Sequence, residues 1–243
     1  MTTFTVDVSH WDWDRNGGNL DWPAIRRSGF AGVCIRASYG APGGYFPTTR
    51  QFYAMARSTK DAGFPLVGGY HNLVHGPPDY IGAQVTHFRN ELAAVGANWA
   101  MVDVEPYEAL RDNNLWPRWE DVLAFQEAWY KATTRPLAFY IARWVWLDWL
   151  EMPDLRLLRG PLVSARYIMG TTQSTPHDLY ERSGGDSSSA WAEYGNRVPD
   201  LWQYSSNAIV LGASRVTDVN AYRGTLQQLT SVLTGEPEPV DTC

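Results

Sequence analysis

Short β-rich runs alternate with helix-like segments along most of this chain, and the alternation limits the possible folds more than any other feature. Segments with helical spacing separate the first five runs; the clearest are Tyr80–Val95, which Gly96 ends, and Trp119–Thr133. Such alternation predicts βαβ units and a parallel sheet. Eight strands are predicted, at Thr5–Ser9, Gly32–Ser38, Leu66–Asn72, Trp99–Glu105, Leu137–Ala142, Leu162–Tyr167, Leu201–Ser206 and Val216–Tyr222.

Eight strands in a chain of 243 residues predict an α/β barrel of TIM type, in which the last three strands carry few helices. The polar stretch 170–200, which includes the run SGGDSSS, is expected to be an excursion between two late strands, partly helical around Ser189–Tyr194. We expect one catalytic domain over residues 1–234. The acidic segment 235–243, GEPEPVDTC, has the composition of a linker.

Charge and hydropathy exclude several function classes. The net charge is −6, from 20 Lys and Arg against 26 Asp and Glu, and a negatively charged protein does not favour binding to the negatively charged backbone of nucleic acid. An apolar run long enough to cross a membrane is missing, and so is the pattern of a signal peptide. Two cysteines do not make a disulfide framework. We therefore expect a protein that binds neither nucleic acid nor membrane. A monomer that needs no cofactor or metal is expected as well.

The segment AMVDVEP, residues 100–106, carries the first candidate chemistry. Side chains alternate along a strand, so Asp103 and Glu105 face the same way, with Cβ atoms roughly 6–7 Å apart. Pro106 lacks a backbone donor and predicts the end of the strand. Active sites of such barrels lie at the carboxyl ends of the strands, which is where this pair falls. Two carboxyls at this spacing can act on one substrate.

Two further acids stand in similar strand-end settings. Asp7 lies between valines in FTVDVSHW, and Asp218 lies in RVTDVNAY within the last predicted strand. Singly, either acid also fits a helix cap or a loop. If the barrel closes, however, four acids meet at one mouth, and they cannot all ionise freely. One should then stay protonated near neutral pH and serve as a general acid, as glycoside cleavage requires.

The sequence resembles the glycoside hydrolase family 25 lysozymes, which are N-acetylmuramidases and include many phage endolysins. The resemblance runs in order from Phe4 to about Leu229, and the pairing of WQYSS with a following DVN is its most specific part. The other matching motifs are DVSHW near the start, GGYHN at 68–72, MVDVEP, ARY at 165–167 and the continuation TDVNAYRGTLQQL.

This resemblance implies a flattened TIM-like barrel with five β/α units and three further strands. It also implies hydrolysis of the β-1,4 bond between N-acetylmuramic acid and N-acetylglucosamine in bacterial peptidoglycan. Glu105 would be the general acid/base, and Asp103 the nucleophile or the group that orients the substrate's 2-acetamido arm. Asp7 and Asp218 would tune the site and hold substrate. The aromatic subsite residues would be Tyr39, Tyr70, Tyr140, Tyr167 and Trp202.

Some features depart from the family pattern or allow another function. IRASYG, residues 35–40, stands where many members carry a lysine, and LVSARY lacks a common tryptophan. His71 and His75 are expected to be packed or hydrogen-bonded side chains rather than metal ligands.

Two other functions are alternatives to a lysozyme. One is a non-catalytic glycan-binding barrel, which the presence of all four acids disfavours, and the other is a chitinase-like glycosidase.

The expected place of action is the bacterial cell wall. With no signal peptide in the chain, two routes to that wall fit the sequence. One is that of a phage endolysin made in the host cytoplasm. The other is secretion followed by removal of the signal.

Overall fold

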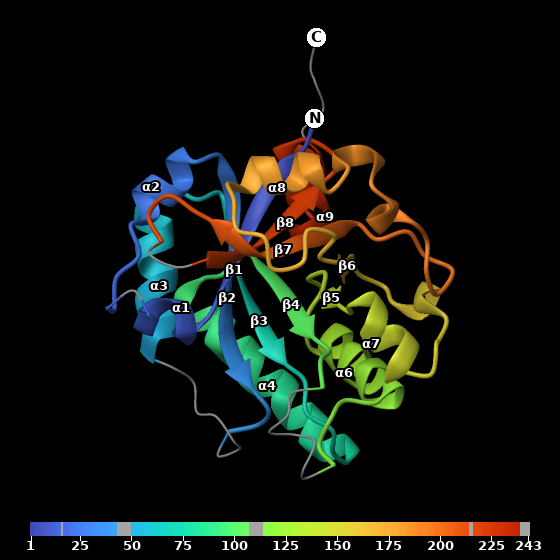
Figure 1. Cartoon of the computed structure of the whole chain (residues 1–243). Coiled ribbons are helices and arrows are strands. Elements are labelled where there is room, and N and C mark those ends of the chain that lie inside the picture. The colour runs from blue at the N-terminus through green and yellow to red at the C-terminus, as the bar shows by residue number, and fades with distance from the viewer. Residues whose placement is uncertain (16, 43–49, 107–113, 214–215, 239–243) are drawn as a thin grey trace.

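Eight strands form a closed barrel in the computed structural model, which describes residues 1–15, 17–42, 50–106, 114–213 and 216–238 (Figure 1). Strands β1 to β7 pair in parallel, each with the next along the chain. Strand β8 runs antiparallel to both β7 and β1 and closes the barrel. The strands are β1 (Thr3–Val8), β2 (Phe30–Tyr39), β3 (Leu66–Asn72), β4 (Trp99–Asp103), β5 (Ala138–Tyr140), β6 (Leu162–Ala165), β7 (Leu201–Ile209) and β8 (Val216–Tyr222).

Helices surround the barrel and cover the outward faces of its strands (Figure 1). Most strand residues are buried, because one face of each strand fills the barrel and the other packs against helices. The helices are α1 (His10–Arg15), α2 (Trp22–Arg27), α3 (Arg50–Asp61), α4 (Pro78–Val95), α6 (Trp119–Ala132), α7 (Arg143–Asp148), α8 (Pro176–Arg182) and α9 (Leu226–Thr234), with short 3-10 turns η1 (Leu155–Leu157), η2 (Gly185–Ser187) and η3 (Ser189–Trp191).

The predicted α/β barrel is confirmed, and so are its eight strands. Helix α4 ends at Gly96, whose φ of 60° is the left-handed conformation that glycine adopts readily. The boundary that bears most on the site is that of β4, which ends at Asp103 and so leaves Glu105 beyond the strand. Strand β5 is also shorter than predicted, and β7 is longer.

The polar stretch 170–200 is an excursion between β6 and β7, as predicted. It contains α8 and the turns η2 and η3, the last within the expected helical part. Its aromatic side chains anchor it, because Tyr180 and Trp191 pack against Trp202 of β7 at ring-centroid distances of 5.8 and 5.6 Å.

The reversed direction of β8 decides which of its residues lie at the barrel mouth. Asp218 is the third residue of β8, and it pairs in register with Asp7 near the carboxyl end of β1. The start of β8 thus lies beside the ends of the parallel strands. At the far end of the chain, helix α9 stops at Thr234, and residues 235–238 are exposed. None of the helices within the described ranges is long and apolar enough to cross a membrane.

Candidate active site

A polar pocket of about 110 Å³ opens at the mouth of the barrel. All four acids that the sequence predicted to meet contribute to its wall. We call it the acid pocket; it is lined by Asp7, Tyr70, Met101, Asp103, Glu105, Tyr140, Tyr167, Gln203 and Asp218. These residues come from β1, β3, β4, β5, β7, β8 and the segments that follow β4 and β6. Side chains far apart in the sequence therefore share one cavity.

Strand alternation places the acids of the β4 segment. Met101, Asp103 and Glu105 all line the acid pocket, so the period of two continues past the end of β4. The backbone N–H of Val104 donates to the carbonyl oxygen of Tyr140 at 3.0 Å, which keeps this segment bonded to β5 beyond the strand proper. Val104 itself is fully buried on the other face.

Asp7 and Asp218 pair in register across the β1–β8 closure; Asp7 is buried and Asp218 is half-buried. Burial raises the pKa of Asp7 to about 6, although the hydrogen bonds from Asn220 and Gln203 act in the opposite direction. Burial also raises the pKa of Asp218 well above its usual value, and the negative charge of Asp7 adds to this shift. The carboxyl that keeps its proton most readily therefore lies within this pair, and it is distinct from Glu105, to which the family resemblance assigns the role of general acid/base.

A buried amide holds Asp103. Its side chain is 5% exposed and accepts a hydrogen bond from Asn72 Nδ2 at 2.5 Å. Asn72 ends β3 and pairs in register with Asp103 on β4. An amide NH₂ group can only donate, so the contacted oxygen of Asp103 acts as an acceptor in a fixed orientation. A fixed acceptor at this place can face either a developing positive charge or an amide N–H of a ligand.

Glu105 is the more accessible acid of the β4 segment. It is partly exposed, whereas Asp7 and Asp103 are buried. Its negative charge contributes to the raised pKa of Tyr140 and of Asp218, which places its carboxyl within electrostatic reach of both. A carboxyl with this exposure can exchange a proton with water and still contact a ligand in the pocket.

Gln203 connects the aromatic and the acidic sides of the acid pocket. Its Oε1 accepts hydrogen bonds from the hydroxyls of Tyr140 and Tyr167 at 2.9 and 2.5 Å. Its Nε2 donates to Asp7 Oδ2 at 2.9 Å. One amide therefore orients two tyrosine rings and a carboxyl that arise from three different segments of the chain.

Three of the five predicted aromatic subsite residues, Tyr70, Tyr140 and Tyr167, line the acid pocket. Burial raises the pKa of each hydroxyl above its usual value, so each remains a neutral donor at physiological pH. The ring of Tyr167 is 39% exposed and stands at the rim.

The other two predicted aromatic residues lie outside the pocket lining. Trp202 is fully buried among Tyr180, Trp191 and Tyr204, and its Nε1 donates to the carbonyl oxygen of Arg166 at 3.0 Å. Its expected contact with substrate is therefore wrong, because alternation along β7 points Gln203 inward and Trp202 toward the outer layer. Tyr39 is 4% exposed and packs with Val74.

Sequence reasoning missed several polar groups around the acids. Asn72 and Gln203 lie in the motifs GGYHN and WQYSS, and their place beside a strand acid is decided only by the register. Asp12 in α1 accepts hydrogen bonds from the Ser9 backbone and hydroxyl at 2.7 and 3.1 Å, and its charge raises the pKa of Asp7 and Asp218. Arg36, in contact with His10, supplies a positive charge that acts on Tyr70.

The two histidines of the GGYHN region are packed and hydrogen-bonded. His71 is fully buried between the rings of Phe88 and Phe125, and burial lowers its pKa to about 3. Ser38 Oγ and Gln84 Oε1 lie 2.9 and 3.0 Å from its two ring nitrogens. His75 Nδ1 lies 2.9 Å from Asp121 Oδ2. Their side chains are thus accounted for by structural contacts.

Comparison with known proteins shows which fold this is. No model of a protein family and no curated protein matches the sequence. The solved structures that share the fold over nearly all of this chain include a lysozyme from Streptomyces coelicolor (20% identity, 96% of this chain, 97% of that chain, TM-score 0.66), a family GH25 lysozyme from Aspergillus fumigatus (19%, 97%, 100%, 0.64), and the endolysin ply40 catalytic domain from bacteriophage P40 of Listeria monocytogenes (16%, 95%, 97%, 0.66). The chain has the fold of the glycoside hydrolase family 25 lysozymes.

Proposed function

We propose that this protein is a peptidoglycan-cleaving lysozyme that hydrolyses the β-1,4 bond between N-acetylmuramic acid and N-acetylglucosamine. One observation carries the proposal: the carboxyls of Asp7, Asp103, Glu105 and Asp218 share one small cavity at the carboxyl ends of the barrel strands. The lysozymes and the endolysin with the same fold support the substrate class. The place of action that follows is the bacterial cell wall, and the proposed partner is a glycan strand bound by a monomer.

Glu105 is proposed as the general acid/base. It is the partly exposed acid of the β4 segment, so it can reach the glycosidic oxygen and exchange its proton with water. It gives the proton to the leaving oxygen as the bond breaks. It then takes a proton from the water that completes hydrolysis, which restores the starting state.

Asp103 is proposed to face the sugar carbon that becomes positively charged. Its carboxylate is held in place by Asn72, which suits a group that must meet that centre at a fixed distance. Two routes fit this position. Asp103 forms a covalent bond to the sugar, or it orients the 2-acetamido group, which then attacks instead; both routes retain the anomeric configuration.

The Asp7–Asp218 pair is proposed to bind substrate and to set the charge of the pocket. A carboxyl that keeps its proton donates a hydrogen bond, so this pair can offer both a donor and an acceptor to sugar hydroxyls. The hydroxyls of Tyr140 and Tyr167, fixed by Gln203, supply further polar contacts beside the flat faces of their rings.

The test compares Glu105→Gln with the native protein on purified peptidoglycan. We expect the release of reducing ends to fall by at least about a hundredfold, because the amide cannot donate the proton. Glu181→Gln, which removes an exposed carboxyl on α8, is the matched control and should retain native activity. Circular dichroism checks that both variants fold.

Mass spectrometry of the released fragments separates the proposal from its rivals. N-acetylmuramic acid at the new reducing ends supports the proposed bond, and N-acetylglucosamine there contradicts it. Faster cleavage of N-acetylglucosamine oligomers than of peptidoglycan indicates the chitinase-like alternative. Wall binding without any new reducing ends indicates the glycan-binding barrel.

A further inference from the structure

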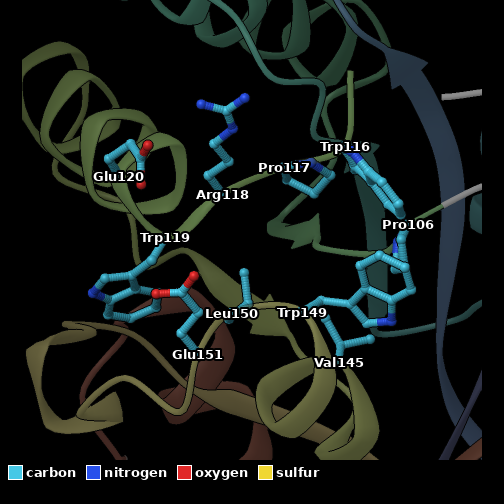
Figure 2. Close-up of a pocket in the computed structure, with 10 residues that line it drawn as sticks. All are labelled: Pro106, Trp116, Pro117, Arg118, Trp119, Glu120, Val145, Trp149, Leu150 and Glu151. Atoms are coloured by element: carbon cyan, nitrogen blue, oxygen red, sulfur yellow. The ribbon is translucent and has the colours of Figure 1, made fainter. Parts of the chain in front are cut away.

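A second pocket, larger than the acid pocket, is lined by residues that follow β4, begin α6 and belong to the α7 region. Its volume is about 450 Å³, and three tryptophans contribute to its wall. We call it the tryptophan pocket. Figure 2 shows Trp116 and Trp149 beside Pro106 on one side, with Trp119 and Glu151 on the opposite side; the lining residues are Pro106, Trp116, Pro117, Arg118, Trp119, Glu120, Val145, Trp149, Leu150 and Glu151.

Two of these tryptophans form an accessible aromatic wall. The ring centroids of Trp116 and Trp149 lie 4.2 Å apart with an interplanar angle of 41°. Trp149 is nevertheless 38% exposed, so part of this ring surface faces solvent. Exposed tryptophan faces in a concave site offer large apolar contact area, and sugar rings present flat C–H faces of matching shape.

Polar groups stand around the same pocket. Arg118, Glu120 and Glu151 all line it and are all exposed. Together they offer hydrogen-bond donors and acceptors beside the aromatic wall. An apolar wall with a few polar groups fits a ligand that has flat apolar faces and hydroxyl or acetamido edges.

The backbone around the tryptophan pocket is unusual. Asn114, Glu151 and Met152 have φ angles of 54°, 60° and 55°, which non-glycine residues rarely adopt. Asn114 Oδ1 accepts a hydrogen bond from Trp116 Nε1 at 3.3 Å, and Glu151 lines the pocket. Backbone of this kind persists where surrounding contacts hold it, and it gathers at ligand sites.

We propose that the tryptophan pocket is a second sugar-binding subsite, which holds N-acetylhexosamine units of the same glycan strand away from the bond that is cut. Its position supports this occupant, because Pro106 lines the pocket and directly follows Glu105 in the chain. The backbone of the segment that follows β4 thus contributes one residue to each pocket. A strand bound at the acids can continue onto the tryptophans. This inference rests on the proposed function.

Binding of glycan oligomers of increasing length tests the proposal. The parent protein is Glu105→Gln, which prevents turnover, and the probes are peptide-free alternating N-acetylglucosamine–N-acetylmuramic acid disaccharide, tetrasaccharide and octasaccharide. Calorimetry should show that the affinity of the parent rises with length. We expect Trp149→Ala in this background to weaken octasaccharide binding about tenfold, a free-energy change of about 1.4 kcal/mol, and to reduce the rise with length. Trp149→Phe should restore most of it.

Trp144→Ala is the matched control, since Trp144 also lies on the α7 segment, is 46% exposed and does not line the pocket. It should bind each oligomer as the parent does. Trp116→Ala is a second test of the same wall and should weaken octasaccharide binding in the same way. Thermal melts of all variants confirm that they fold.

Three results would overturn the subsite. Equal octasaccharide binding by the parent and the folded Trp149→Ala and Trp116→Ala variants would show that no sugar stacks there. Weaker binding only of a tetrasaccharide that carries its stem peptides would assign the pocket to peptide. A parent that binds none of the oligomers would reject the proposed function together with the subsite, whereas the first two results leave it intact.

Discussion

The carboxyl of Asp7 shows how a single buried residue links the site to stability. Its folded-state pKa is raised from 3.8 to about 6, mainly by burial, so the folded protein binds this proton more tightly than the unfolded chain. The stabilising contribution is complete below pH 3.8 and is lost as the pH rises through about 6. At neutral pH the ionised carboxyl is therefore destabilising. The carboxyl of Asp7 thus lowers the stability of the folded protein at the pH at which its charge is present.

Asp7→Asn should consequently stabilise the protein at neutral pH. The amide stays neutral at every pH and can still accept from Gln203, so the free energy of unfolding should rise by up to about 3 kcal/mol above pH 6. Below pH 3.8 the gain should vanish. Urea denaturation over a series of pH values measures this, with Glu181→Gln as the exposed control. Lower stability of the variant at neutral pH would contradict the argument.

Trp202 and Gln203 are adjacent, yet only Gln203 reaches the acid pocket. Composition favours the tryptophan as the sugar-binding residue, whereas the direction of side chains along β7 assigns it to the core. No local signal in WQYSS separates these two choices. The orientation depends on how β7 pairs with β6 and β8.

Trp202→Ala should therefore act on stability. Removing a fully buried tryptophan leaves a cavity, and we expect the free energy of unfolding to fall by about 3–5 kcal/mol. Trp202→Phe should lose less because it retains part of the packing. Urea denaturation and steady-state kinetics are measured together. A raised KM with native stability would instead restore Trp202 to the substrate site.

Among the elements, the β4 segment was the most predictable part of the site. Alternation of Met101, Asp103 and Glu105 against buried valines follows from the pleat of a strand, and Pro106 marks where the ladder stops. The segment needed no distant information to orient its acids. What it could not indicate was the partner of Asp103, because Asn72 comes from the neighbouring strand.

Close packing between β3 and β4 gives a test at the scale of the element. A Cβ atom at Gly68 would lie 2.3 Å from the ring of Trp99, whose side chain is buried. We expect Gly68→Ala to lower the free energy of unfolding by about 1–3 kcal/mol, because the ring has no room to move.

Gly82→Ala is the matched control for that substitution. Gly82 lies inside α4, and a Cβ atom at this position would have no neighbour within 4 Å, so alanine should stabilise the helix by about 0.5–1 kcal/mol. Urea denaturation of both variants gives the comparison. Equal effects of the two substitutions would show that the β3–β4 contact is not tight.

At the scale of the whole molecule, strand β8 closes the barrel and completes the site. It gives β1 and β7 their antiparallel neighbour and brings Asp218 to Asp7. A chain that ends at residue 213 lacks β8 and α9, so it leaves two strand edges open and uncovers their apolar neighbours. We expect this truncated chain to lose cooperative thermal unfolding, as monitored by circular dichroism and tryptophan fluorescence. A native-like melt would contradict this.

The sequence by itself determined the order of the strands, the two clearest helices, the barrel class and the four candidate acids, because hydrophobic periodicity and helix- or strand-ending residues are local features of a sequence. Only the tertiary structure decided that Gln203 faces inward, that Asn72 holds Asp103 and that Trp116 and Trp149 meet. Each of these depends on register between strands or on packing between distant segments. Such relations are set when the barrel closes, since no stretch of sequence contains both partners.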